Sequence, residues 1–230
     1  MDELRDELAR DSATLEGLPA EEILQWVFAR YAGRRIALSS AFGPEGCALI
    51  DLARRLDPGV PIYTIDTGYL FPETLAVRDA FRARGADIRV VEPLLTIRAQ
   101  AERHGPDLFA RDPDACCGLR KVEPMRRVLD MVDVWITALR RDQAPTRRDT
   151  PILGTATRQD GTLVIKAAPL VAWTRRDTWD YLLGREVPYN RLLDEGYSSV
   201  GCEPCTVKPP GDERSGRWAG FGKTECGLHK

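Results

Sequence analysis

The stretch RIALSSAFGPEG, residues 35–46, decides the fold of this 230-residue chain. It starts as a short apolar strand over 35–39, passes through a loop rich in Ser and Gly, and leads into a predicted helix over 47–56. Small loop residues let the backbone approach an anion, and the following helix N-terminus adds a positive field. The loop is neither a Walker A loop nor a GxGxxG dinucleotide loop. It predicts either another kind of phosphate- or sulfate-binding loop or a tight turn without a ligand.

The pattern of strand followed by helix continues on both sides of this stretch. Apolar runs predict strands at 61–65, 87–91 and 134–138, and a hairpin of 152–155 with 163–167 that turns at Asp160 and Gly161. Helices are predicted at 2–16, 20–32, 72–84, 95–103, 119–130 and 174–183, the last with Thr174 and Asp177 as a weak capping box. This alternation predicts an α/β fold, a mostly parallel twisted sheet with helices on both faces.

The chain divides by composition near its end. We expect a single α/β domain over residues 1–205 and a flexible, mobile C-terminal tail over 206–230, where Gly, Pro and charged residues dominate. Ligands of parallel sheets bind beyond the carboxyl ends of the strands. The loop after the first strand, Asp66 after the second and Arg140 with Arg141 after the fourth all fall on that edge.

Composition and charge restrict the possible partners. The net charge of −2 gives no general attraction to nucleic acid or membrane, and no apolar run approaches the ~20 residues that span a bilayer. The acidic N-terminus, MDELRDELARD, does not resemble a signal peptide. We therefore expect a cytoplasmic protein, in which thiols stay reduced and cysteines are ligands or catalysts rather than disulfides.

Four cysteines form two doublets, Cys116 with Cys117 and Cys202 with Cys205. Grouped thiolates are soft ligands that suit an iron–sulfur cluster or zinc. Adjacent cysteines are strained around one small ion, whereas a wider cubane offers each thiolate its own iron. The spacing thus favours 4Fe–4S, with a structural zinc site and unliganded thiols as the alternatives. Cys47 is expected to be buried and apolar.

Cys226 stands apart from the doublets, near the end of the chain. Lys223, His229 and Lys230 surround it, and nearby cations stabilise a thiolate, which is the nucleophilic form. A cysteine without a role is the alternative. Local groups of arginine, at 140–141, 147–148 and 214 with 217, fit a small anionic ligand better than a polymer, although surface ion pairs are the commoner fate of arginine.

Six segments in order resemble the signatures of the sulfonucleotide reductases. They are SSAFGPEG (39–46), DTGYLFPET (66–74), CCGLRK (116–121), RRDQ (140–143), GCEPC (201–205) and ECGLH (225–229). The cysteine doublets resemble those of the cluster-bearing branch, the assimilatory adenylyl-sulfate reductases. The resemblance implies an adenine nucleotide α-hydrolase-like fold with a variant of its pyrophosphate loop.

The resemblance also implies a reaction and its residues. Cys226 would attack the sulfur of adenylyl sulfate (adenosine 5′-phosphosulfate), releasing AMP and forming an S-sulfocysteine, from which thioredoxin would release sulfite. Cys116, Cys117, Cys202 and Cys205 would hold one 4Fe–4S cluster per chain, and a homo-oligomer is implied. The residues expected to bind the substrate are Ser39, Ser40, Phe42, Gly43, Gly46, Asp66, Lys121, Arg140, Arg147, Arg214, Arg217 and His229.

Three other functions remain possible from the sequence. A 3′-phosphoadenylyl-sulfate reductase differs only in its substrate, and the spacing does not show whether a 3′-phosphate is accepted. An ATP-pyrophosphatase-type adenylating enzyme is less favoured, because its Ser-Gly-Gly-x-Asp-Ser loop is absent. A non-enzymatic sensor that binds adenine nucleotide would leave Cys226 without a catalytic role.

Overall fold

The computed structural model describes residues 2–208, 214–218, 220–223 and 225–228. The strands in this part of the chain are β1 (Ile36–Ser39), β2 (Ile62–Ile65), β3 (Ile88–Val91), β4 (Val134–Ile136), β5 (Leu153–Thr157) and β6 (Leu163–Ala167). The α-helices are α1 (Asp2–Leu15), α2 (Ala20–Arg30), α3 (Pro44–Leu56), α4 (Pro72–Ala83), α5 (Ile97–His104), α6 (Leu108–Arg111), α7 (Pro113–Cys117), α8 (Glu123–Met131) and α9 (Arg175–Gly184).

Short helical turns complete the described elements. A π-helical turn, η1 (Gly118–Val122), joins α7 to α8. Four 3₁₀ turns follow later in the chain: η2 (Arg141–Gln143), η3 (Pro145–Arg147), η4 (Arg191–Leu193) and η5 (Glu203–Cys205). The elements η1, η2, η3 and η5 all lie in segments that the sequence marks as candidate site.

One six-stranded sheet has the order β3-β2-β1-β4-β6-β5. All neighbours pair in parallel except β5 and β6, which form the predicted antiparallel hairpin. β1 lies between β2 and β4, so the chain winds outward from β1 in both directions. A crevice therefore forms at the carboxyl ends of β1 and β4, where ligands of open α/β sheets bind.

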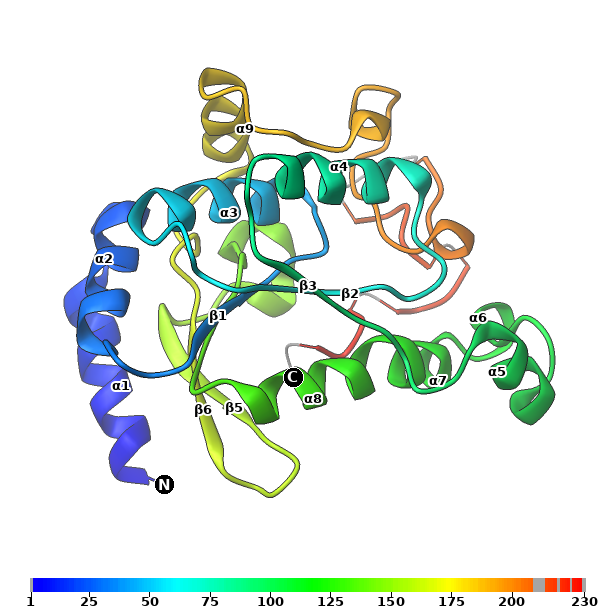
Figure 1. Cartoon of the computed structure of the whole chain (residues 1–230), viewed down its shortest axis with the longest axis horizontal. Helices are drawn as coiled ribbons and strands as arrows, with labels where there is room; N and C mark the ends of the chain where they lie inside the picture. Colours follow the sequence, from blue (N-terminus) through cyan, green and yellow to red (C-terminus); the bar gives the residue numbers. More distant parts are fainter. Residues whose placement is uncertain (1, 209–213, 219, 224, 229–230) are drawn as a thin grey trace.

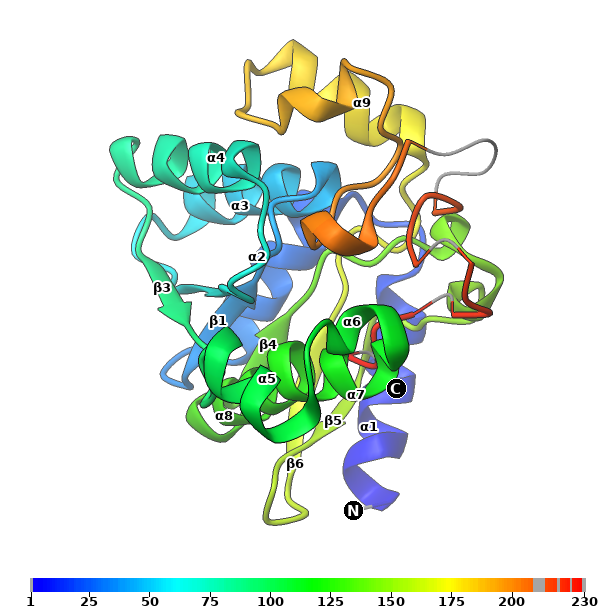
Figure 2. The same cartoon turned by 90° about the vertical axis from the view of Figure 1, so that its right-hand side faces the viewer.

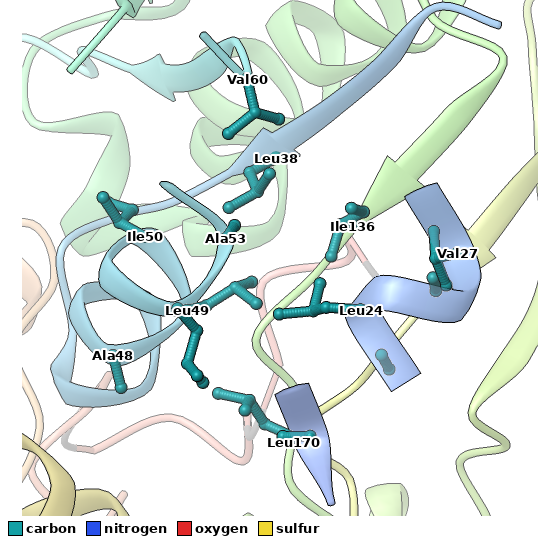
Figure 3. Packing of buried hydrophobic residues seen from close by; sticks show 14 of the residues in the cluster. Leu24, Val27, Leu38, Ala48, Leu49, Ile50, Ala53, Val60, Ile136 and Leu170 are labelled. Atoms are coloured by element: carbon teal, nitrogen blue, oxygen red, sulfur yellow. The ribbon is translucent and has the colours of Figure 1, made fainter. Parts of the chain in front are cut away.

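Alternate strand residues supply two separate cores. Leu38 of β1 and Ile136 of β4 are buried on one face, where they meet Leu24 of α2 and Leu49 of α3. Figure 3 shows these side chains converging between the strands and the helices. In Figure 1 the helices α2, α3, α4 and α9 lie on this side of the sheet.

The opposite face is covered mainly by α8. On this face Ala37, Tyr63 and Trp135 pack against Met125 and Val128 of α8. Each of the three strand residues is adjacent in the chain to a residue of the first core. Figure 2 shows α7 and α8 below the sheet and the α4 and α9 layer above it. The predicted α/β sheet with helices on both faces is confirmed.

Two helical segments near the candidate site differ from those predicted. α3 begins at Pro44 rather than at residue 47, because Pro at the first helical position has the φ angle that a helix needs. The predicted helix over 119–130 is preceded by α7, which contains the first cysteine doublet. Asp112 caps α7 by accepting a hydrogen bond from the Ala115 N–H, at 2.9 Å, and Pro113 again occupies the first turn.

The described part of the predicted tail returns to the body of the protein. Val207 N–H donates to Gly216 O at 2.9 Å, and Trp218 N–H donates to Cys205 O at 3.0 Å. Leu228 packs at the edge of the core under α8. The boundary at residue 205 and the mobility of 206–230 stay predictions. Within the described ranges, no helix has the length and apolar character needed to cross a bilayer.

Candidate active site

A cavity of about 230 Å³ lies at the carboxyl ends of β1, β2 and β4. The loop after β1, the π-helical turn η1 and the returning tail all contribute to its walls. The sequence-predicted residues that line it are Ser39, Ser40, Gly43, Gly46, Lys121, Arg147, Cys202, Arg214, Arg217 and Cys226. Residues far apart in the sequence thus meet in one place, which we call the cleft.

The loop after β1 is shaped to present polar hydrogens to the cleft. Trp135 Nε1–H donates to Ser39 Oγ at 2.7 Å, which leaves the Ser39 hydroxyl hydrogen for another acceptor. Phe42 N–H donates to Ser40 Oγ at 3.0 Å. A Cβ on Gly46 would collide with that same Ser40 Oγ. The first turn of α3 therefore closes tightly on the loop, with its N-terminal end at the cleft.

Three predicted ligand-binding residues do not line the cleft. Phe42 is buried, with φ of 56°, and stacks on Phe81 with ring centroids 6.3 Å apart. Asp66 accepts from Gly68 N–H at 2.9 Å and pairs with Arg78 at 3.7 Å. Phe42 and Asp66 therefore shape the loops beside the cleft.

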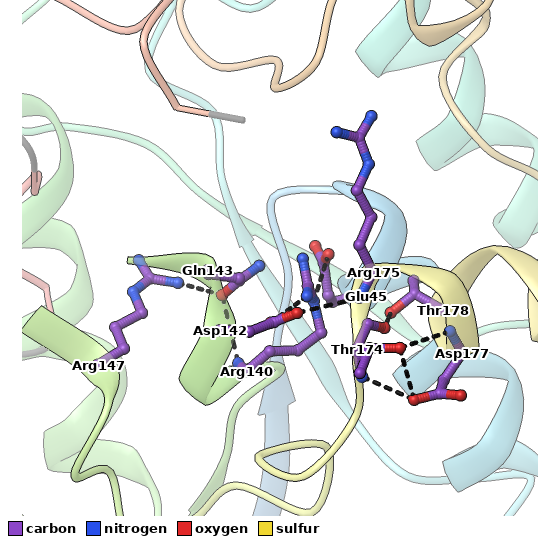
Figure 4. A network of polar contacts seen from close by, with 9 residues as sticks. All are labelled: Glu45, Arg140, Asp142, Gln143, Arg147, Thr174, Arg175, Asp177 and Thr178. Atoms are coloured by element: carbon purple, nitrogen blue, oxygen red, sulfur yellow. Dashed lines mark hydrogen bonds and ion pairs between the residues drawn. The ribbon is translucent and has the colours of Figure 1, made fainter. Parts of the chain in front are cut away.

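Arg140 is the third residue of this group, and its side chain is fully buried. Its Nε–H donates to Glu45 Oε1 at 2.9 Å, and a second ion pair joins it to Asp142. A buried guanidinium is stable only with such carboxylate partners. Figure 4 shows that this network continues from Asp142 to the first turn of α9 and through Gln143 to Arg147. Arg140 thus ties Glu45 and the β1 loop to the turns after β4. His229 lies outside the described residues.

The cleft has further residues that the sequence did not single out. Thr137 directly follows β4 and Trp218 belongs to the tail. Thr137 Oγ1, Trp218 Nε1 and Arg217 Nε are buried, and none has a hydrogen-bond partner in the described part of the chain. Buried polar atoms are almost always paired. The cleft therefore presents polar groups suited to a polar ligand. The position of Thr137 at the end of a strand could have marked it as a site residue. Nothing in the sequence marked Trp218 as one.

The two cysteine doublets lie near one another, and Cys202 of the second doublet lines the cleft. Cys116 and Cys117 end α7, whereas Cys202 directly precedes η5 and Cys205 is its last residue. Cys202 also bridges to Leu70, and its Sγ lies 3.3 Å from Thr67 Oγ1.

Burial raises the pKa of Cys116 to about 11, and the charges of the other three thiols add to the effect, so all four lie within electrostatic reach. Four soft, largely buried donors fit an iron–sulfur cluster, whose positive irons favour thiolates. Within the described ranges, no three Cys, His, Asp or Glu side chains are grouped so as to hold one metal ion.

Lys121 of η1 lines the cleft within electrostatic reach of Cys202 and Cys117 rather than facing solvent. Burial lowers the pKa of Lys121, but the nearby charges of Cys202, Cys117 and Cys226 outweigh burial and raise it above its usual value. Its Nζ lies 5.7 Å from the ring centroid of Trp218, and the guanidinium carbon of Arg217 lies 4.8 Å from the same centroid. The charged end of Lys121 thus belongs to the site.

Cys226 is partly exposed and lines the cleft together with Lys121 and Arg217. The preceding residue, Glu225, forms an ion pair with Arg147 at 2.7 Å. Burial alone would raise the pKa of Glu225, but Arg147 and Arg214 hold it below its usual value. In contrast, Cys47 is fully buried and burial strongly raises the pKa of its thiol, so it is the inert core cysteine that was expected.

The strand order, with β1 between β2 and β4, and the β1 loop define the class of protein: an α/β protein of the adenine nucleotide α-hydrolase-like fold. The family model described as the phosphoadenosine phosphosulfate reductase domain matches residues 35–208. A protein of Geobacillus kaustophilus named adenosine 5′-phosphosulfate reductase is 45% identical over 214 residues, which cover 91% of this chain and 89% of that protein. The chain therefore belongs to the phosphoadenosine phosphosulfate reductase domain family.

Two further relatives agree with this assignment. A protein of Mycobacterium tuberculosis with the same name, adenosine 5′-phosphosulfate reductase, is 42% identical over 246 residues, covering 99% of this chain and 95% of that protein. The crystal structure of phosphoadenylyl-sulfate reductase from Candida auris, in a phosphate complex, is similar with a TM-score of 0.75 at 27% identity. That similarity covers 88% of this chain and 97% of the Candida chain.

Proposed function

We propose that this chain reduces adenylyl sulfate to sulfite and AMP, with Cys226 as the nucleophile. The observation that carries the proposal is that Cys226, the β1 loop and the cations Lys121 and Arg217 line one cleft. The names of relatives at more than 40% identity support the same substrate.

The chemistry proceeds in two transfers. The Cys226 thiolate attacks the sulfate sulfur, the bond from sulfur to the bridging oxygen breaks, and AMP leaves with that electron pair. The product is an S-sulfocysteine. A thiolate of a dithiol donor then attacks Cys226 Sγ, and sulfite leaves with the electrons of the sulfur–sulfur bond. The donor's second thiol resolves the mixed disulfide, so the donor is oxidised and the Cys226 thiolate returns.

The walls of the cleft supply what the first transfer needs. Negative charge grows on the departing phosphate and on the sulfonate oxygens. The Ser39 hydroxyl and the first turn of α3 offer hydrogen bonds, and Lys121 and Arg217 offer positive charge. Because these groups are held in place before the substrate arrives, they stabilise the charge without rearrangement.

A 4Fe–4S cluster on Cys116, Cys117, Cys202 and Cys205 is part of the proposal. The donor set and its burial fit such a cluster, which would supply a fixed local charge and join α7 to η5. Lys121 lines the cleft within electrostatic reach of Cys202 and Cys117, so it can couple the two electrostatically. The two electrons come from the dithiol donor, for which we propose thioredoxin. A homo-oligomer in the cytoplasm completes the proposal.

Replacing Cys226 by Ser tests the role of the nucleophile. The variant should form no sulfite with adenylyl sulfate and thioredoxin, while nucleotide affinity changes less than about threefold, because the cleft is otherwise intact. Cys47→Ala is the matched control, since Cys47 is buried in the core and does not line the cleft. Sulfite formation by Cys226→Ser at a rate near that of the unmodified enzyme would rule out the proposed nucleophile.

Reduction of 3′-phosphoadenylyl sulfate is the second candidate. The similarity to the Candida auris reductase favours it, although at lower sequence identity than the adenosine 5′-phosphosulfate reductases. Competition between the two nucleotides decides the question. We expect kcat/KM to be at least about 100-fold higher for adenylyl sulfate. A higher kcat/KM for 3′-phosphoadenylyl sulfate would instead assign the chain as a 3′-phosphoadenylyl-sulfate reductase.

A further inference from the structure

The segment around Cys226 runs between two cavities. Cys226 and Leu228 line the cleft, whereas Lys223 and Glu225 line a second cavity of about 660 Å³. Glu225 and Cys226, which are adjacent in the chain, thus line different cavities. Contacts made by residues 223 and 225 therefore bear on how Cys226 is placed.

Glu225 joins the tail to two arginines that also line the cleft, Arg147 and Arg214. Arg147 Nε–H donates to Oε1 at 2.7 Å and Arg147 Nη2–H to Oε2 at 2.8 Å, a two-point pair between body and tail. Arg214 Nη2–H adds a third bond, at 3.3 Å. The side chains of Arg147 and Glu225 are only 11% and 20% exposed. A pair so shielded from water is stronger than an ordinary surface pair.

Arg147 is itself held in position by the body of the protein. Its Nη1–H donates to Gln143 Oε1, and the same oxygen accepts from Arg140 N–H at 3.3 Å. Figure 4 shows this line of contacts running from Arg147 through Gln143 to Arg140 and Glu45. The arginine that binds Glu225 is thus connected to Glu45, which lines the cleft in the first turn of α3.

A second ion pair attaches the same segment. Lys223 Nζ pairs with Asp114 of α7, and Lys223 is nearly buried. Lys223 also lies 5.5 Å from the ring centroid of Trp218. The segment is therefore fixed on one side by two charged residues that precede Cys226 in the chain.

We propose that Glu225 is a positioning residue for Cys226, which it orients toward the cleft by binding Arg147. This inference rests on the proposed role of Cys226 as the nucleophile. Arg147 uses Nε and Nη2 on Glu225 and Nη1 on Gln143. Its Nε, Nη1 and Nη2 are all engaged by protein groups, and we infer that its effect on the reaction passes through the tail. A misplacement of a reacting atom by about 1 Å can cost ~100-fold in rate, so losing the pair should slow sulfur transfer.

The test uses the cluster-loaded full chain, without donor, at saturating adenylyl sulfate. Formation of S-sulfocysteine is followed by mass on the tryptic peptide 224–230, TECGLHK, which contains one cysteine. Glu225→Gln should slow this step by about 10- to 100-fold and leave nucleotide Kd within about threefold. Arg147→Gln should show a similar loss, and the double variant should be no slower than the single ones, because both remove one interaction.

Glu102→Gln is the control, since it removes an exposed ion pair with Arg98 on α5. It should behave as the unmodified enzyme. The proposal is overturned if Glu225→Gln forms S-sulfocysteine at the unmodified rate. It is also overturned if the loss lies entirely in nucleotide Kd, because Arg147 would then serve the substrate directly.

A second measurement separates this inference from the proposed function. Iodoacetamide is added without nucleotide, and alkylation of the 224–230 peptide is timed. Glu225→Gln should be alkylated at least about threefold faster, because the thiol leaves the cleft more often. If the unmodified enzyme forms no S-sulfocysteine, the proposed nucleophile fails, and alkylation still reports on positioning. Equal alkylation rates would overturn the positioning role.

Discussion

Single residues decide how cations reach the cleft. Arg217 Nη1–H donates to Val200 O at 3.2 Å and to Ser199 Oγ at 3.4 Å, while its guanidinium lies over Trp218. This placement requires Gly201, since a Cβ there would overlap the guanidinium. A glycine that looks like part of a cysteine motif thus makes room for an arginine.

Gly201→Ala should therefore weaken substrate binding. The added methyl displaces Arg217. We expect nucleotide Kd to rise about tenfold, because one charge-assisted contact to the ligand is lost. Isothermal titration on the cluster-loaded protein measures it. Gly184→Ala is the control, because a Cβ at Gly184 meets no atom within 4 Å. An unchanged Kd in Gly201→Ala would show that Arg217 does not contact the ligand.

The cysteine doublets make a separate prediction at this scale. Cys116→Ser and Cys205→Ser should each lower bound iron and the brown charge-transfer absorbance, since each removes a thiolate ligand. Cys47→Ala should keep both, because Cys47 is a core residue. Iron assay and absorption spectra of anaerobically purified protein provide the measurement. A colourless protein that contains zinc and has full activity would contradict the cluster.

At the scale of elements, ion pairs at the amino ends of the strands hold the sheet together. Asp133 directly precedes β4, and Arg35 directly precedes β1. The Asp133 carboxylate accepts hydrogen bonds from Arg35 N–H and Nε–H, both at 3.1 Å, and from Arg35 Nη2–H at 2.7 Å. Arg158 from the β5–β6 hairpin adds a bond at 2.9 Å. These hydrogen bonds and charges hold the pKa of Asp133 well below its usual range.

Asp133→Asn should destabilise the fold in a pH-dependent way. A carboxyl whose pKa is lowered on folding contributes stability that is present above its unfolded pKa and lost as pH falls through the folded value. At pH 7 we expect a loss of about 1–2 kcal/mol, which reflects charged hydrogen bonds on a partly exposed group. The difference should shrink below about pH 4. Thermal unfolding from pH 3 to 8 measures it; a pH-independent difference would contradict the account.

Most of the fold followed from local sequence patterns. Short apolar strands, the β1 loop and the Asp160–Gly161 turn predicted the parallel sheet and its hairpin, because period and turn chemistry are local. The π-helical turn at 118–122 was not predictable, since an ordinary helical pattern runs through it. It follows the first cysteine doublet and places Lys121 against the cleft, as π turns often do at functional sites.

The site was only partly predictable for the same reason. Residue type marked the serines, arginines and cysteines as candidates, but it did not show which charged side chains form pairs with one another. Arg140 has the chemistry of an anion ligand and is instead buried with Glu45. Glu225 looked like a neighbour of the nucleophile, and its pairing with Arg147 spans 78 residues. Such long-range pairs depend on the tertiary fold and leave no local pattern.

At the scale of the whole molecule, the tail completes the cleft that the sheet begins. The body supplies the β1 loop, Lys121 and Cys202, whereas Arg217, Trp218 and Cys226 come from the tail. Binding in the cleft and closure of the tail should therefore be coupled. Figures 1 and 2 show the C-terminal segment returning to lie along α7 and α8.

AMP should protect Cys226 from alkylation in this arrangement. A nucleotide in the cleft contacts tail and body together, so it favours the closed form. At saturating AMP we expect iodoacetamide to modify the 224–230 peptide at least about fivefold more slowly than in the free enzyme. Adenosine without phosphate should protect less. Equal alkylation rates with and without AMP would show that bound nucleotide does not affect the tail.

One experiment tests the central claim most directly. The cluster-loaded enzyme is mixed with adenylyl sulfate that is radiolabelled at sulfur, without any thiol donor, and is then digested with trypsin. The account predicts label on the 224–230 peptide, one AMP released for each labelled chain, and release of the label as sulfite when thioredoxin is added. Sulfite formation on adding thioredoxin from an enzyme that never carried label on that peptide would contradict it.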